Sequence, residues 1–143
     1  MSNDIGAMME AVREMWNTGD TSKAAPYYLP SALRSAPNQA KALTGVAEIA
    51  EYVRQMRLAF PDARLTFNEV VAGNDCQVVL WTFTGTQQGD YLGIPASGKA
   101  VSITGVTWVR LKDGLILSEE VFFDNLTVLQ ALGALPAASA AAG

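Results

Sequence analysis

The spacing of the apolar residues changes once along the chain, and this change limits the folds that the chain can adopt. Before Pro61, apolar residues recur every three or four positions, which is the period of amphipathic helices. After Pro61 the period becomes two, which is the period of half-buried strands. Helices followed by a run of strands are typical of an α+β fold.

Two main helices are predicted in the first part of the chain. The apolar stripe of the first extends from Ile5 to Trp16, and a short second helix through Tyr27 and Tyr28 follows it. The next long helix begins after Thr44, a candidate N-cap, and keeps helical spacing over residues 46–60. The stretch between them has little periodicity, and a brief strand at residues 32–35 is its only predicted element.

Four strands and a last helix are predicted after Pro61. Asp113-Gly114 is a hairpin signal between the last two strands, and Asp124 is a candidate N-cap for the helix. We expect a curved antiparallel sheet wrapped around the N-terminal helices, with a short C-terminal helix. The strands are predicted at residues 65–69, 77–87, 99–111 and 115–123, and the helix at residues 126–132.

A single domain is expected over residues 1–136. The chain has 143 residues and half of them are apolar, which is enough for one hydrophobic core. No internal repeat is present. The Ala-rich residues 137–143 are predicted to form a disordered C-terminal tail.

The composition argues against nucleic-acid binding and against a metal site. The net charge of −4 disfavours a nucleic-acid partner, because such proteins usually concentrate Lys and Arg. The absence of histidine removes the commonest metal ligand and general base, and the lone Cys76 cannot form an internal disulfide or a zinc site. We therefore expect no metal and no cofactor.

The sequence also gives an expectation of location. No apolar stretch is long enough to cross a bilayer, and the first residues lack the pattern of a secretion signal. A cytoplasmic protein without a membrane partner is predicted.

The segment Tyr91–Val106, YLGIPASGKAVSITGV, begins a series of motifs that resembles the SnoaL-like polyketide cyclase family. Val109-Arg110 and Asp113-Gly114 follow in the same order, and Trp16–Asp20 and Ala59–Asp62 match upstream. The resemblance covers nearly the whole chain. It implies membership of the nuclear transport factor two-like superfamily, a cystatin-like α+β cone with a pocket between sheet and helices, and a homodimer.

The family's catalytic residues are absent from their positions in this chain. In the ring cyclases, an Asp acts as acid and base, with a His nearby on a neighbouring strand. A gapless alignment places Thr107 at the histidine position and Val121 at the aspartate position. Because valine cannot move a proton, either the chain is not a cyclase or the proton-transfer group lies elsewhere in the pocket.

Glu119 is the candidate replacement for the missing acid. Strand alternation places Glu119, Val121 and Phe123 on one face, so that Glu119 faces the pocket if Val121 does. Burial would then raise its pKa and suit it to general base catalysis. The alternative is a solvated charge near the sheet edge or a dimer surface. Thr107 can orient a carbonyl group through one hydrogen bond.

Further residues are candidates for the wall of the pocket, with ordinary core packing as the alternative for each. Gly105 either opens room for a ligand or marks a bulge. Asp124 is interpreted as an N-cap rather than a second catalytic carboxylate, and Arg110 as the ion-pair partner of Glu120. The predicted lining residues are Trp16, Tyr28, Phe60, Trp81, Gly105, Val121 and Phe123.

Two main functions remain open from the sequence. The first is a SnoaL-like enzyme of cyclase, isomerase or hydrolase type that acts on a small apolar carbonyl compound through Glu119, with help from Thr107 and Tyr28. The second is a module that binds a small ligand or dimerises without catalysis. A cofactor-free oxygenase is a third possibility, which no residue requires.

Overall fold

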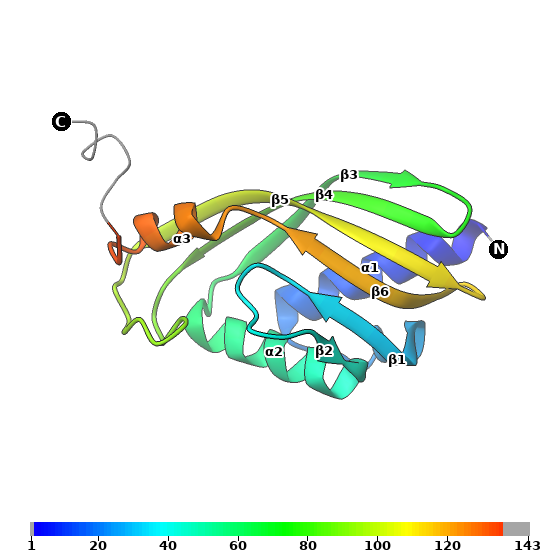
Figure 1. Cartoon of the computed structure of the whole chain (residues 1–143), viewed down its shortest axis with the longest axis horizontal. Helices are drawn as coiled ribbons and strands as arrows, with labels where there is room; N and C mark the ends of the chain where they lie inside the picture. Colours follow the sequence, from blue (N-terminus) through cyan, green and yellow to red (C-terminus); the bar gives the residue numbers. More distant parts are fainter. Residues whose placement is uncertain (1, 136–143) are drawn as a thin grey trace.

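The computed structural model describes residues 2–135, in which three α-helices pack against one six-stranded sheet (Figure 1). The last residue of the predicted domain and the predicted tail at 137–143 lie outside the described residues. The helices are α1 (Ser2–Thr18), α2 (Gly45–Ala59) and α3 (Asn125–Ala131), with a 3₁₀ helix, η1 (Ala25–Tyr27). The strands are β1 (Tyr28–Ser35), β2 (Leu43–Thr44), β3 (Arg64–Ala72), β4 (Cys76–Thr86), β5 (Ala100–Lys112) and β6 (Leu115–Phe122).

The strands lie in the order β2-β1-β6-β5-β4-β3. Every neighbouring pair is antiparallel except β1 and β6, which run parallel. The expectation of a purely antiparallel sheet is therefore wrong at this one pairing. Most of the chain separates β1 from β6, so that no hairpin dictates their relative direction.

The start of β1 differs from the prediction, because Tyr28 is extended rather than helical, with φ −98° and ψ 133°. The predicted second helix is reduced to the three residues of η1, which begins next to Pro26. The strand then runs over eight residues instead of the expected four. Arg34, within the predicted part of the strand, is buried on the inner face of the sheet.

The hydrophobic core fills the space between the helices and the concave face of the sheet. α1 packs against β3 and α2 packs against β1, as Figure 1 shows for the two helices on one side of the sheet. Met8, Met15 and Ile49 are among the completely enclosed helix residues. The predicted apolar stripes therefore correspond to the buried faces of α1 and α2.

Irregularities in the strand pairing accompany the curvature of the sheet at three places, one of which lies between Tyr28 and Leu33 in the pairing of β1 with β6. A second register shift lies between Phe67 and Glu69 in β3, and a third lies between Arg110 and Leu111 in β5. Such bulges bend and twist a strand. The turn between β5 and β6 is the predicted Asp113-Gly114, whose φ angles of 54° and 76° fit the left-handed conformation of a tight hairpin.

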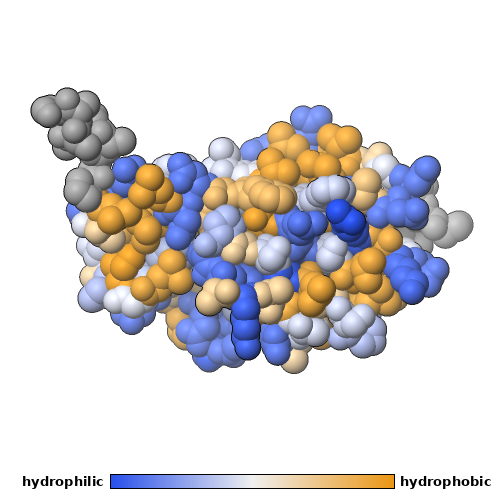
Figure 2. Space-filling model, in the orientation of Figure 1, coloured by the Kyte–Doolittle hydropathy of each residue, from blue (hydrophilic) through white to orange (hydrophobic). Residues whose placement is uncertain are grey.

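The outer face of the sheet carries apolar side chains among polar ones, visible as orange areas between blue ones in Figure 2. Leu80, Val106 and Phe122 follow each other in register across β4, β5 and β6. Phe122 is 54% exposed and Leu80 is 36% exposed. Across residues 2–135, no helix has the length and apolarity needed to cross a membrane.

Candidate functional site

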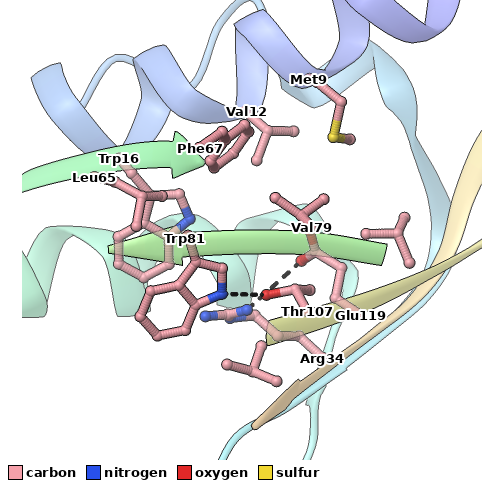
Figure 3. Close-up of a pocket in the computed structure, with 12 residues that line it drawn as sticks. Met9, Val12, Trp16, Arg34, Leu65, Phe67, Val79, Trp81, Thr107 and Glu119 are labelled. Atoms are coloured by element: carbon pink, nitrogen blue, oxygen red, sulfur yellow. Dashed lines mark hydrogen bonds and ion pairs between the residues drawn. The ribbon is translucent and has the colours of Figure 1, made fainter. Parts of the chain in front are cut away.

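Two adjoining cavities lie inside the cone, between the helices and the concave face of the sheet. Both are lined by Trp16, Arg34, Trp81 and Val121, and the first is shown in Figure 3. Their volumes are about 50 Å³ and about 60 Å³. Each has room for a few water molecules, so that a ligand larger than a small ring must displace side chains.

Glu119 lies at the wall of the first cavity as part of a buried polar cluster. It pairs in register with Arg34 of the neighbouring strand β1, and the two residues are 5% and 7% exposed. Nη1 of Arg34 lies 3.8 Å from Oε1 of Glu119, which is an ion-pair distance (Figure 3). The hydroxyl of Tyr28 donates a hydrogen bond of 3.0 Å to Oε2.

Burial raises the pKa of Glu119 above its ordinary value of 4.5, although the charge of Arg34 and the hydrogen bond from Tyr28 both act to lower it. Burial and the charge of Glu119 likewise raise the pKa of Tyr28 well above 10.0. The cluster therefore contains a carboxyl group that can hold a proton nearer to neutral pH than an exposed one. Tyr28 stays protonated and serves as a hydrogen-bond donor.

The guanidinium of Arg34 lies against two aromatic rings at the junction of the cavities. Its central carbon is 5.1 Å from the ring centroid of Trp16 and 5.3 Å from that of Tyr52. The Tyr52 hydroxyl donates to Oδ1 of Asn38 at 2.9 Å. The Nε–H group of Arg34 is buried and has no hydrogen-bond partner within the described chain.

Sequence reasoning missed Arg34, Tyr52 and Asn38 as site residues. Arg34 and Asn38 fall in the stretch with little periodicity, and Tyr52 lies on α2 among residues assigned to an ordinary amphipathic helix. Strand alternation alone favours the wrong face, because Leu33 is the bulkier apolar residue of the predicted brief strand and lies opposite Ala32 and Arg34. In the structure Leu33 is 47% exposed and Arg34 is buried.

Thr107 and Val121, which the sequence resemblance aligns with the catalytic positions of the ring cyclases, lie side by side. Thr107 of β5 pairs directly with Val121 of β6, and both line the first cavity. Oγ1 of Thr107 accepts a hydrogen bond of 2.9 Å from Nε1 of Trp81. Within residues 2–135 the hydroxyl hydrogen of Thr107 has no acceptor, so that it can rotate toward a ligand.

Gly105 provides the space that the indole of Trp81 occupies. A Cβ atom at this position would lie 2.3 Å from Cζ2 of Trp81 and 2.8 Å from the backbone oxygen of Phe122. The pairing of β4 with β5 continues through Gly105 without a register shift, which argues against the alternative of a bulge in this pairing. The ring of Trp81 fills the space beside Gly105.

Most of the remaining predicted wall residues line one or both cavities, and Tyr28 lines neither. Phe60 and Phe123 line the second cavity, whereas Trp16, Trp81 and Val121 line both. Tyr28 lines neither of them and contacts Glu119 through its hydroxyl. Tyr28 therefore reaches the cavity wall only through its hydrogen bond to Glu119.

A second fully buried polar side chain, Gln77 of β4, lies in the same row of the sheet as Glu119. Val109 of β5 separates the two, since it pairs with Gln77 on one side and with Glu119 on the other. Gln77 is 0% exposed, and neither of its amide atoms has a partner within residues 2–135. Its amide group is a local cost to stability.

Two charged residues considered from the sequence have structural roles. Oδ1 of Asp124 accepts a hydrogen bond of 3.0 Å from the backbone N–H of Leu126, which confirms Asp124 as the N-cap of α3. Arg110 lies 3.7 Å from Glu120 on the outer face, as predicted. Among the described residues, no group of three or more His, Cys, Asp or Glu side chains is arranged to hold a metal ion.

Comparison with known proteins gives one family match. The family model for the SnoaL-like polyketide cyclases matches residues 6–132. No curated protein sequence matches the chain.

Solved structures with the same fold are numerous. TsrD from Streptomyces laurentii has 27% identity and a TM-score of 0.85, with 94% of this chain and 98% of that chain covered. A protein from Jannaschia sp. CCS1, proposed to be a SnoaL-like polyketide cyclase, has 26% identity and a TM-score of 0.77, with 92% and 94% covered. A protein from Catenulispora acidiphila with a ketosteroid isomerase-like fold has 13% identity and a TM-score of 0.75, with 88% and 92% covered.

Proposed function

Because the chain belongs to the SnoaL-like polyketide cyclase family, we propose that it is an enzyme that moves a proton on a small apolar carbonyl compound. The observation that carries this proposal is the buried carboxyl group of Glu119 at the cavity wall, with a pKa raised by its burial. A base of this kind is stronger than an exposed carboxylate and still releases its proton readily. In this proposal Glu119 takes the acid–base role that the ring cyclases give to the aspartate aligned with Val121.

The neighbours of Glu119 give each part of this reaction a candidate group. Tyr28 fixes the carboxyl group by donating to Oε2, so that Oε1 is the oxygen directed toward Arg34. Thr107 can donate its hydroxyl hydrogen to a carbonyl oxygen while it still accepts from Trp81. Removal of a proton next to a carbonyl is the step that aldol cyclisation and double-bond isomerisation share.

The size of the cavities limits the substrate. Volumes of about 50 Å³ and about 60 Å³ favour a compound of one ring, or a larger one that enters when side chains move. Apolar walls formed by Trp16, Trp81 and Val121 favour a hydrocarbon body. The pair of charged residues at the wall of the first cavity favours a carbonyl group placed next to Glu119.

Deuterium exchange into cyclohexanone tests the proposal without knowledge of the natural substrate. The protein is mixed with the ketone in heavy water, and loss of the proton signal next to the carbonyl is followed by NMR. We expect the wild type to accelerate exchange over buffer and Glu119→Gln to lose about 100-fold or more of that acceleration. Glu120→Gln is the matched control, because Glu120 follows on the same strand and is 43% exposed on the opposite face.

A non-catalytic binding module is the second candidate. The contacts that Glu119 makes with Arg34 and Tyr28 are also those of a structural ion pair, which favours this alternative. Binding of cyclohexanone without any exchange above buffer would support the module and contradict the enzyme. Exchange that Glu119→Gln and Glu120→Gln reduce equally would also contradict a role for Glu119.

We further propose that a second copy of the chain covers the outer face of the sheet. The row formed by Leu80, Val106 and Phe122 supports this arrangement, because monomers seldom expose large contiguous apolar patches. Phe122→Asp should convert a dimer to a monomer in sedimentation experiments. Leu58→Asp is the control, since Leu58 is 56% exposed but lies on α2. A wild type that sediments as a monomer would refute the proposal.

A further inference from the structure

We propose that Arg34 binds the carbonyl oxygen of the substrate and stabilises the negative charge that forms on it, so that the site selects compounds able to become delocalised enolates. The inference rests on the proposed function, because it names the substrate class of the same site. The inference gives a role to Arg34, whose strand was not connected with the site from the sequence. It also says which ligands the site prefers, namely those that form a delocalised enolate.

The position of Arg34 is the first observation behind this assignment. Arg34 lines both cavities, and its side chain is 8% exposed. Among the described residues that line the two cavities, the charged ones are Arg34 and Glu119. Glu119 lines the first cavity, so a ligand that reaches Glu119 there lies beside the guanidinium as well.

The incomplete hydrogen bonding of Arg34 is the second observation. Its Nε–H group is buried without a partner, and its closest approach to Glu119, 3.8 Å, is longer than a hydrogen bond. A guanidinium carries five N–H donors, and a buried charged donor without an acceptor is costly. An oxygen atom of a ligand in the cavity would supply the acceptor.

Two aromatic rings hold the guanidinium in place for this contact. Trp16 and Tyr52 approach its central carbon to 5.1 Å and 5.3 Å, and both rings line the second cavity. Stacking on aromatic rings orients an arginine while its N–H groups stay directed outward in the plane. Donors fixed before the reaction stabilise a developing oxyanion better than mobile ones.

The proton transfer conserves the charge of the cluster. The carboxylate of Glu119 takes the proton, an O–H bond forms on Glu119, and the substrate's C–H bond breaks. The electron pair of that bond moves into the carbonyl group, so that its oxygen becomes the enolate oxygen. Arg34 thus faces one negative charge before the step, on Glu119, and one after it, on the ligand.

The other titratable groups at the cluster stay neutral during this exchange. Tyr28 faces Glu119 and Tyr52 faces Arg34, and burial raises the pKa of both hydroxyls. Neither tyrosine competes with Glu119 for the proton near neutral pH. The site should therefore bind an enolate best when Glu119 is protonated, and binding should weaken as rising pH removes that proton.

Binding of three small cyclic compounds tests the proposal. Dimedone is an enolate near neutral pH, cyclohexanone is its uncharged counterpart, and cyclohexanecarboxylate carries a charge of different geometry. Affinities are measured by titration of the intrinsic tryptophan fluorescence, since Trp16 and Trp81 line the cavities. We expect the wild type to bind dimedone more tightly than either of the other two.

Substitutions of two arginines separate charge recognition from folding. Arg34→Met should weaken dimedone binding about tenfold or more and change cyclohexanone binding little, and Arg34→Lys should give an intermediate loss. Arg110→Met is the matched control, because Arg110 also pairs with a carboxylate at 3.7 Å and stacks on a ring at 4.3 Å, but on the outer face. Circular dichroism confirms that each variant is folded.

The outcomes distinguish this inference from the proposed function. Equal weakening of dimedone and cyclohexanone in Arg34→Met, no preference for dimedone in the wild type, or no binding of dimedone would each overturn it. Tighter binding of the carboxylate than of dimedone would also overturn it, in favour of a carboxylate site. If Arg34→Met does not fold, two other measurements decide the result. Arg34→Lys should weaken dimedone binding more than cyclohexanone binding, and Glu119→Gln should remove the pH dependence of dimedone binding. Failure of either expectation would overturn the inference.

Catalysis has its own readout. Deuterium exchange that depends on Glu119 but not on Arg34 would keep the proposed function and reject the inference. A dimedone preference that depends on Arg34 without any exchange would keep the subsite and reject the enzyme.

Discussion

Replacing Glu119 by glutamine should change the way in which the stability of the protein depends on pH. Burial raises the pKa of the Glu119 carboxyl above 4.5, against the opposing effects of Arg34 and Tyr28. Between the unfolded and the folded pKa, the folded protein holds a proton that the unfolded chain has released. The stability that this proton contributes is complete below pH 4.5 and is lost as the pH rises through the folded pKa.

The magnitude follows from the binding of one proton. In this pH window the unfolding free energy of the wild type should fall, relative to Glu119→Gln, by up to about 1.4 kcal/mol per pH unit. Above the folded pKa the difference should become constant. Glu119→Gln also removes the counter-charge of Arg34, but this effect shifts the whole curve and leaves its slope unchanged.

Guanidinium denaturation over a series of pH values measures the slope. Glu120→Gln removes the same charge from the next residue of β6, on the exposed face, and its curve should run parallel to that of the wild type. A wild type that gains stability over Glu119→Gln as the pH rises would refute the reasoning. That result would mean that the attraction of Arg34 outweighs burial and keeps Glu119 ionised.

Substitutions at three further positions test other parts of the structure through the free energy of unfolding. Gln77→Met should stabilise the protein by about 1–2 kcal/mol, because it removes a buried amide that lacks partners, and unchanged or lower stability in denaturation would contradict this. Gly105→Ala should destabilise it by about 1–3 kcal/mol, because the new Cβ would displace the ring of Trp81, and a change in the near-ultraviolet circular dichroism should accompany the loss. Asp124→Ala should cost about 1 kcal/mol through loss of the α3 cap, whereas Asp124→Asn should retain most of the stability; equal effects would argue against capping.

Most of the fold could be predicted because its signals are local. The stripe from Ile5 to Trp16 and the alternation on either side of Asp113-Gly114 each depend on residues close in sequence. The two-residue β2 was not predicted; the ends of the other strands differ from the prediction by at most a few residues, and β1 is the exception. Its partner strand lies far away in the chain, so nothing near Tyr28 indicates how long the pairing continues.

In the polar cluster around Glu119, the sequence predicted only the part that one strand determines. Alternation within β6 places Glu119 on the same face as Val121, and this holds in the structure. The partners of Glu119 depend instead on the pairing of β1 with β6 and on the packing of α2, which bring Arg34 and Tyr52 into place. The sequence also could not show that Trp81 fills the space at Gly105, because that contact depends on a rotamer in the assembled core.

The parallel pairing of β1 with β6 has a consequence for the order of folding. Arg34 and Glu119 meet only when the first strand after the opening helix joins the last strand of the sheet, which is a contact between distant parts of the chain. Such contacts close large loops and form late and slowly, after local hairpins such as that of β5 and β6. A nascent or partly unfolded chain would then lack the charged pair altogether, so that ligand binding should report on completion of the sheet.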